Sequence, residues 1–167
     1  MVSLVLDASS LILLAKIDLL EVIGTELELC ITEKVKKEAT KKGTKDAKLI
    51  ERRIELGDIE VEEIDKKESE TLADDFNLDE GEASAIVLYQ RMDADILATD
   101  DGKAIDTCKI LDVRYTTTLN LLIRAVEKEK LGRERGVAKL EKLDDYGWYK
   151  SRLIENARKS IRGDENE

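Results

Sequence analysis

Short apolar segments alternate with longer amphipathic segments along this chain. Residues 2–6 form a short apolar run with β-branched members, and residues 27–31 and 59–64 alternate between apolar and polar side chains. Runs of this length and period are typical of strands. We therefore predict a sheet of four to five strands, at residues 2–6, 27–31, 59–64, 96–99 and 112–116.

The segments between these runs repeat their apolar positions every three or four residues, which is the period of a helix. Ser9 and Ser10 offer N-caps for the first helix, and Thr32 offers one for the third. Gly24 and Gly43 mark a helix end and a break. The predicted helices cover residues 11–15, 19–23, 33–39, 47–57, 67–76, 80–89, 103–108, 117–130, 134–143 and 145–162.

This alternation of strands and helices predicts one α/β domain. Parallel strands need long crossover connections, and the helices in those crossovers cover both faces of the sheet. A chain of 167 residues is long enough for one such core and too short for two comfortable ones. We expect a three-layer sandwich with a central, mainly parallel sheet over residues 1–160, followed by a frayed tail at 161–167.

The composition narrows the chemistry that this domain can perform. The chain contains no histidine and two widely separated cysteines, Cys30 and Cys108. Acid/base or triad chemistry based on histidine is therefore excluded, and a zinc site of the Cys/His type is not expected. We interpret the cysteines as small buried residues of a reduced compartment. The sequence shows no signal segment and no membrane span, so we expect a cytoplasmic protein.

Charge is distributed unevenly around a net value of −10. The overall acidity argues against a nucleic-acid binder. However, residues 34–53 carry nine basic against three acidic side chains, whereas residues 55–82 carry thirteen acidic against two basic ones. The basic segment could hold a phosphate backbone, although a solvated helix face explains such a run as well. The candidates for RNA contacts are Lys34, Lys36, Lys37, Lys41 and Lys42.

Four acidic positions stand where an apolar run gives way to a loop or a helix. Asp7 follows the first predicted strand and Asp100 and Asp101 follow the fourth, so they are expected at the carboxyl edge of the sheet, where open α/β folds bind ligands. Glu38 and Glu82 lie in helical segments that can reach over this edge. Clustered carboxylates repel one another unless a cation lies among them, and hard divalent cations prefer oxygen ligands. The pattern therefore favours a carboxylate metal site.

Each of these acids alone also has a structural explanation. Asp7 can cap the helix that follows it, and Asp100 or Asp101 can cap the short helix after the fourth strand. Glu38 can be a solvated helix residue, and Glu82 can complement a helix dipole. The two serines after Asp7 can serve as caps and leave it free to bind a ligand. However, four acids with unrelated structural roles would rarely meet at one sheet edge, so a shared metal site explains the pattern better.

Four short motifs, in their order and spacing, resemble the PIN-domain family, close to the VapC-type ribonuclease toxins and their archaeal relatives. They occupy residues 4–10, 35–38, 78–86 and 97–101, and the resemblance extends over roughly residues 2–126. Each motif is short and common alone, whereas all four together are fairly specific.

The resemblance implies a PIN-like three-layer sandwich and a metal-dependent endoribonuclease. Its ligands for Mg²⁺ or Mn²⁺ would be Asp7, Glu38, Glu82 and an aspartate at 100 or 101. Counting from the preceding threonine favours Asp101, and counting from Glu82 favours Asp100, so both stay candidates. The resemblance also implies RNA as substrate and a small antitoxin protein as partner.

Several side chains near these motifs have supporting roles in this interpretation. Ser9 and Thr99 are candidates for hydrogen bonds to the ligand acids or to phosphate. Tyr146, Trp148 and Tyr149 cluster near the carboxyl end, and we interpret them as a packing anchor or as a contact in a homodimer.

Two other classes of protein remain open. An aspartate after the first strand is a nucleophile or phosphoacceptor in haloacid-dehalogenase-like phosphatases and in receiver domains. Such a phosphatase has a second aspartate where this chain has Ser9, and the acidic pair and late lysine of a receiver are not clearly present. The other class is a PIN-like module that binds RNA or protein with little activity. The presence of all four acidic positions argues against a decayed site.

Overall fold

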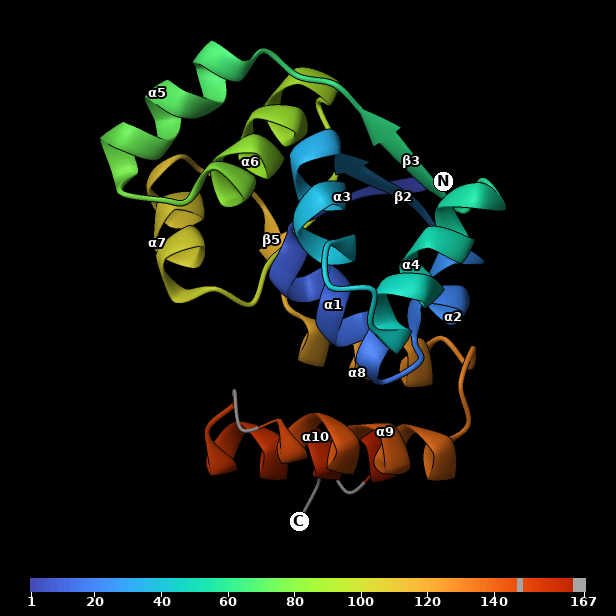
Figure 1. Ribbon diagram of the computed structural model, residues 1–167. Coiled ribbons are helices and arrows are strands. Elements are labelled where there is room, and N and C mark those ends of the chain that lie inside the picture. The colour runs from blue at the N-terminus through green and yellow to red at the C-terminus, as the bar shows by residue number, and fades with distance from the viewer. Residues whose placement is uncertain (147–148, 164–167) are drawn as a thin grey trace.

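Strands and helices alternate along the chain and build a parallel sheet covered by helices (Figure 1). The computed structural model describes residues 1–146 and 149–163. The strands are β1 (Val2–Leu6), β2 (Leu27–Thr32), β3 (Ile59–Glu62), β4 (Ile96–Ala98) and β5 (Tyr115–Thr116). The helices are α1 (Ala8–Lys16), α2 (Leu20–Gly24), α3 (Glu33–Thr40), α4 (Lys45–Glu55), α5 (Lys66–Phe76), α6 (Glu80–Met92), α7 (Gly102–Ile110), α8 (Thr118–Glu127), α9 (Arg133–Asp145) and α10 (Ser151–Arg162). None of the helices in these described ranges combines the length and the apolar character that crossing a membrane requires.

The strand order places the turning point of the sheet beside β1. The sheet runs β3-β2-β1-β4-β5, and each neighbouring pair is parallel. The chain therefore moves outward from β1 to β3 and then returns to add β4 on the other side of β1. Such a switch point opens a crevice at the carboxyl ends of the two strands. Asp7 follows β1 and Asp100 lies two residues beyond β4, so both lie at this crevice.

Alternate residues of the central strand face two hydrophobic cores. Leu4 and Leu6 of β1 belong to the larger core, which α1 to α4 and α8 to α10 complete. Val5 belongs to the smaller core, which α5, α6 and α7 complete. Side chains of a strand alternate between its faces, so one short apolar run serves both cores. The expected α/β fold with helices on both faces is confirmed, and the five strands among the described residues are all parallel.

The last helices extend the larger core outward. In Figure 1, α9 and α10 lie as an outer layer beyond α8. Ile154 and Ile161 of α10 are buried there, and Gly136 of α9 allows close approach, because a Cβ at Gly136 would lie 2.6 Å from Val126 Cγ2. The expected tail therefore starts too early, since its first two residues lie in α10 with Ile161 buried. Its last four residues lie outside the described residues.

The structure moves several predicted boundaries. Helix α1 begins directly after Asp7, because Asp7 is its N-cap in place of the serines. The last strand is limited to Tyr115–Thr116, because Asp112 adopts the left-handed conformation, with φ of 57°, and turns the chain before the strand. The helix expected over residues 145–162 begins only at Ser151.

Candidate metal centre

A cavity of about 260 Å³ lies at the carboxyl ends of β1 and β4. Its walls carry six carboxylates and otherwise only small residues. The lining residues are Asp7, Ala8, Ser9, Glu38, Asp79, Glu82, Asp100, Asp101 and Gly102. The structure thus brings together all five acids singled out in the sequence and adds a sixth, Asp79.

Asp7 is the most deeply buried of these acids, with 1% of its surface exposed. One carboxylate oxygen, Oδ1, accepts hydrogen bonds from the N–H of Ser10 at 3.0 Å and from the hydroxyl of Ser9 at 2.7 Å. The other oxygen, Oδ2, accepts a hydrogen bond from the hydroxyl of Thr99. Asp7 is therefore both a helix cap and a site residue, and the expected roles of Ser9 and Thr99 beside a site acid are seen here.

Burial raises the pKa of Asp7 to about 6, although the hydrogen bonds from Ser10, Thr99 and Ser9 act in the opposite direction. The negative charge of Asp100 adds to the increase. The protein therefore holds this carboxylate in a place where its charge is unfavourable without a cation, which is the electrostatic situation expected of an acidic ligand in a metal site.

Asp100 and Asp101 are adjacent in sequence but have different surroundings. Asp100 accepts hydrogen bonds from the N–H of Thr118 at 3.1 Å, from the hydroxyl of Thr118 at 2.5 Å and from the hydroxyl of Tyr149. Burial raises its pKa, and these hydrogen bonds oppose the increase. Asp101 instead caps α7, where its Oδ2 accepts the N–H of Ala104 at 3.0 Å. Both acids line the cavity, but only Asp100 is held by α8 and by the segment before α10.

Glu82 and Asp79 form a reciprocal cap at the start of α6. The N–H of Glu82 donates to Asp79 Oδ1 at 2.8 Å, and the N–H of Asp79 donates to Glu82 Oε1 at 3.1 Å. Burial, followed by the hydrogen bond with Asp101, raises the pKa of Glu82 to about 8. For Asp101 burial raises the pKa, but the contact with Glu82 and backbone N–H groups lower it overall. The two carboxylates thus influence each other's ionisation in opposite directions, since the interaction between them raises the pKa of Glu82 and lowers that of Asp101.

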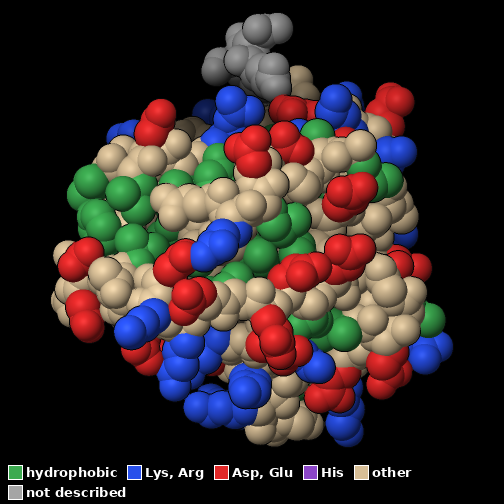
Figure 2. Space-filling model, turned by 90° about the horizontal axis from the view of Figure 1, so that it is seen from above, with side chains coloured by type: hydrophobic (Ala, Val, Ile, Leu, Met, Phe, Trp, Pro, Cys, Tyr) green, Lys and Arg blue, Asp and Glu red, His purple; other side chains and the backbone are tan. Residues whose placement is uncertain are grey.

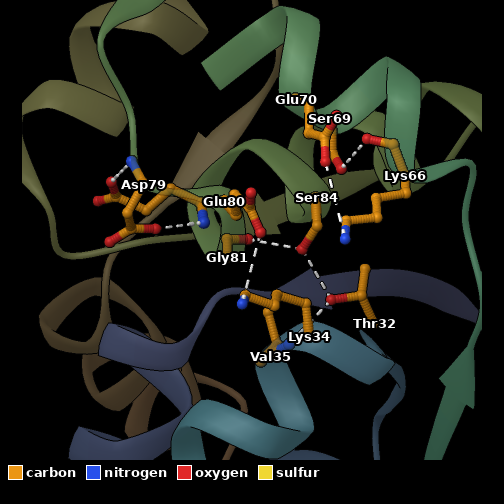
Figure 3. A network of polar contacts seen from close by, with 11 residues as sticks. Thr32, Lys34, Val35, Lys66, Ser69, Glu70, Asp79, Glu80, Gly81 and Ser84 are labelled. Atoms are coloured by element: carbon orange, nitrogen blue, oxygen red, sulfur yellow. Dashed lines mark hydrogen bonds and ion pairs between the residues drawn. The ribbon is translucent and has the colours of Figure 1, made fainter. Parts of the chain in front are cut away.

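A polar network holds the start of α6 against the junction of β2 and α3 (Figure 3). The hydroxyl of Ser84 donates to the carbonyl of Gly81 at 2.7 Å and lies 2.8 Å from the hydroxyl of Thr32. Thr32 caps α3 by accepting the N–H of Val35. Through these contacts, segments far apart in the sequence present Glu82 and the acid of α3 to one cavity.

Gly81 makes room for Glu38, the acid that α3 contributes. A Cβ at Gly81 would lie 2.6 Å from Glu38 Oε1 and 2.7 Å from Glu38 Cδ, so any larger residue there would force the Glu38 carboxylate to move. Burial raises the pKa of Glu38, and the charges of Asp79 and Asp7 add to this, whereas Lys34 and Lys41 lower it. The glycine therefore forms a cradle in which the Glu38 carboxylate faces the other acids.

The donor set fits a hard divalent cation. All groups lining the cavity that can bind a metal are carboxylate or hydroxyl oxygens, as Mg²⁺ and Mn²⁺ prefer. Among the described residues, three ligand atoms within 4.8 Å of one another are found at Cys30, Glu60 and Glu62 and not in this cavity. The carboxylates of the cavity are thus more widely spaced, which suits Mg²⁺ because that ion usually keeps several waters.

The trio on β2 and β3 is a poorer metal site than its spacing suggests. Burial and the charges of Glu62 and Glu60 raise the pKa of the Cys30 thiol to about 11. Metals bind the thiolate, which this environment disfavours at neutral pH. The two glutamates are exposed, and exposed acids commonly lie close together on a strand pair.

Sequence patterns did not identify every side chain of the site. Tyr149 was expected to anchor packing or a dimer, yet its hydroxyl contacts Asp100. Thr118 was not singled out, although it makes three contacts with that acid. Both residues lie well beyond the last acidic motif, so no spacing signal connected them to it. Trp148, the third residue of the aromatic cluster, lies outside the described residues.

The fold and the cavity together define the class of protein. A parallel α/β sheet whose switch point carries a carboxylate-lined cavity is suited to a divalent cation. A family model described as a PIN domain matches residues 3–162, so the chain belongs to the PIN-domain family. No curated protein and no solved structure matches this chain. PIN domains are typically nucleases, which agrees with the acidic site; the closer relation to VapC-type toxins stays a prediction.

The raised pKa of Asp7 predicts how the stability of the metal-free protein depends on pH. Because the folded-state pKa lies at about 6 and the ordinary value is 3.8, the folded chain holds the proton more tightly than the unfolded chain between these values. The free energy of unfolding should therefore fall as pH rises from 4 to above 6, by about 3 kcal/mol for this shift.

Chemical denaturation in EDTA across this pH range measures the effect. The contribution of Asp7 is the difference between the wild type and Asp7→Asn, because the other acids are common to both. If the two proteins lose stability equally as pH rises, Asp7 is not the buried, proton-binding group described here.

Proposed function

We propose that this protein is a metal-dependent endoribonuclease that hydrolyses RNA phosphodiester bonds. The observation that carries the proposal is the cavity at the switch point, where five acids from four separate segments meet. The PIN-domain family indicates a nuclease, and no histidine or cysteine is needed for hydrolysis by a metal-activated water. The residues that would hold Mg²⁺ or Mn²⁺ are Asp7, Glu38, Glu82, Asp100 and Asp101.

The chain itself supplies ligands, orientation and burial. A bound divalent cation lowers the pKa of a water ligand and offsets charge that develops on the phosphate. Ser9 and Thr99 fix the orientation of the Asp7 carboxylate, and Thr118 fixes that of Asp100. Helices α3 and α6 contribute Glu38 and Glu82 to the same cavity. The site is thus assembled from both strand-end and helix carboxylates.

Metal binding and RNA cleavage test the proposal directly. Mn²⁺ or Mg²⁺ should raise the melting temperature of the wild-type protein, because the cation binds the folded site and relieves carboxylate repulsion. The same ions should support cleavage of a mixed pool of structured and single-stranded RNA, and EDTA should stop it. A protein that shows neither the thermal shift nor cleavage is not this enzyme. A thermal shift with RNA binding but without cleavage indicates the binding module instead.

The basic segment beside Glu38 is the proposed path for RNA. Lys41 is exposed and close enough to Glu38 to lower its pKa, and the ion pairs among the described residues do not include it. Lys34 is instead paired with Glu80 at 3.4 Å (Figure 3). In Figure 2, a group of Lys and Arg side chains lies at the lower left of the face shown, and other basic and acidic side chains are spread over it. The surface thus offers local basic regions despite the net charge of −10.

Substitution of Lys41 tests this path. Lys41→Ala should weaken binding of single-stranded RNA severalfold and reduce the slope of log affinity against log salt by about 0.7, the value for one phosphate contact. Lys130→Ala is the matched control, because Lys130 is exposed beyond the far end of α8. Filter binding or fluorescence anisotropy at several salt concentrations, with Asp7→Asn as background to prevent cleavage, measures both. Equal salt dependence of RNA affinity in the two variants would show that Lys41 makes no phosphate contact and is only a solvated surface residue.

The resemblance to VapC-type toxins extends the proposal to an antitoxin partner, a homodimer and a cytoplasmic location. A VapC-type toxin would be neutralised by a small antitoxin protein that covers the acidic cavity, and it would form a homodimer. Both free cysteines, Cys30 and Cys108, are buried, which suits the reducing cytoplasm in which RNA is cut. Light scattering of the purified chain tests the homodimer. Relief of growth inhibition by a coexpressed neighbouring gene product tests the antitoxin.

A further inference from the structure

Tyr149, which lies just before α10, places its phenol against Asp100, one of the acids of the cavity. The hydroxyl of Tyr149 accepts the N–H of Leu119 at 3.3 Å and donates to Asp100 Oδ1. Because Leu119 already donates to this oxygen, the hydroxyl proton of Tyr149 is directed to the carboxylate. The outer layer of helices, which otherwise lies far from the sheet in Figure 1, therefore touches a residue of the site.

Both carboxylate oxygens of Asp100 accept hydrogen bonds from residues outside the acidic motifs. Oδ1 accepts hydrogen bonds from the hydroxyl of Tyr149 and from the N–H of Thr118. Oδ2 accepts one from the hydroxyl of Thr118 at 2.5 Å. The N–H of Asp100 in turn donates to the hydroxyl of Ser9 at 3.1 Å, and Ser9 donates to Asp7. A change at Tyr149 is thereby connected to the orientation of two of the proposed ligands.

We propose that Tyr149 is a positioning residue that orients the Asp100 carboxylate for the divalent cation. This inference rests on the proposed metal site. Hydrogen-bond donors behind a metal ligand fix the direction of its lone pairs, and their loss typically costs about 10- to 100-fold in metal affinity. The carboxyl-terminal part of the chain then serves the site as well as the core, because Tyr149 supplies this donor just before α10.

The hydroxyl of Tyr149 is separable from the packing of its segment. Ile154, Ala157 and Ile161 of α10 are buried in the larger core, and they hold this helix without the phenol oxygen. Tyr149→Phe retains the ring that packs against this core and removes only the donor. Tyr146→Phe is the matched control, because Tyr146 belongs to the same segment but its ring faces Lys16 and not the acidic cavity.

Titration of the full chain with Mn²⁺, followed by electron paramagnetic resonance of the free ion, tests the inference without any activity measurement. Tyr149→Phe should bind Mn²⁺ about tenfold more weakly than the wild type. Thr118→Val, which removes the donor to Oδ2, should shift the affinity in the same direction, and Tyr146→Phe should bind as the wild type does. The melting temperatures in EDTA should stay close together, since the packing is retained.

The outcomes distinguish this inference from the proposed function. Wild-type Mn²⁺ affinity in Tyr149→Phe would overturn the inference, even if the wild type cleaves RNA. A weakened affinity in a protein that cleaves no RNA would support the positioning role and refute the nuclease. Absence of Mn²⁺ binding by the wild type would overturn both the inference and the metal site on which it rests. An equal loss in Tyr146→Phe would show that the segment acts only through folding.

Discussion

Asp7→Asn is expected to abolish RNA cleavage and the thermal shift by Mn²⁺ while leaving the chain folded. Asparagine keeps a carbonyl oxygen that can accept the N–H of Ser10, so α1 keeps its cap. It lacks the negative charge that a divalent cation requires. The loss of metal-dependent stabilisation should reduce the cleavage rate by at least about a thousandfold, equivalent to about 4 kcal/mol.

The stability of the metal-free variant separates loss of function from loss of fold. Asp7 is buried and has a raised pKa, so its charge is unfavourable in the folded state at pH 8. Asp7→Asn removes that charge and should unfold at a higher temperature than the wild type in EDTA. Cleavage on a defined RNA and calorimetry with and without Mn²⁺ measure the two effects. Near wild-type cleavage by Asp7→Asn would remove Asp7 from the site.

Gly81→Ala is expected to cause the second large loss of cleavage, because its added methyl group should displace the proposed ligand Glu38. The new Cβ would lie 2.6 Å from Glu38 Oε1, and neither the backbone of α6 nor its tie to Thr32 through Ser84 allows the helix to withdraw. The Glu38 side chain must therefore move out of the cradle. Misplacement of a site group by about 1 Å can cost about a hundredfold in rate, and we expect a loss of that order in cleavage.

Gly102→Ala is the control for this substitution. Gly102 also lines the cavity and also lies in the first turn of a helix, but a Cβ there would meet nothing within 4 Å. It should retain cleavage and gain helix stability from the removal of a glycine. Glu38→Asp in the Gly81→Ala background shortens the acid by one methylene and should restore part of the rate. Equal rates in the two alanine variants would contradict the cradle.

The strand-end acids could be recognised from sequence because their position follows from local rules. A parallel strand delivers the residue after it to the carboxyl edge of the sheet, and Asp7 and Asp100 obey this rule. The βαβ alternation fixed the α/β class for the same reason, since apolar periodicity is local. Glu38 and Glu82 were predicted from helical segments that can reach over this edge and from the family motifs, and the structure places both on the cavity.

The same acids cap helices and line the cavity, whereas the sequence presented these two roles as alternatives. Asp7 and Asp101 each cap a helix and line the cavity, and Glu82 takes part in a capping box while facing Asp101. A carboxylate has two oxygens and several lone pairs, so one interaction does not exclude the other. The serines thought to release Asp7 from capping are instead its donors.

By itself, the sequence determined the α/β class, the family and the acids that cluster at one sheet edge, because these depend on periodicity and on motifs within short segments. Only the tertiary structure decided what surrounds each acid. It placed Gly81 under Glu38, gave Asp100 and Asp101 different partners, and brought Tyr149 to Asp100. The physical reason is that such contacts join segments distant in the chain, and packing, not local propensity, sets them.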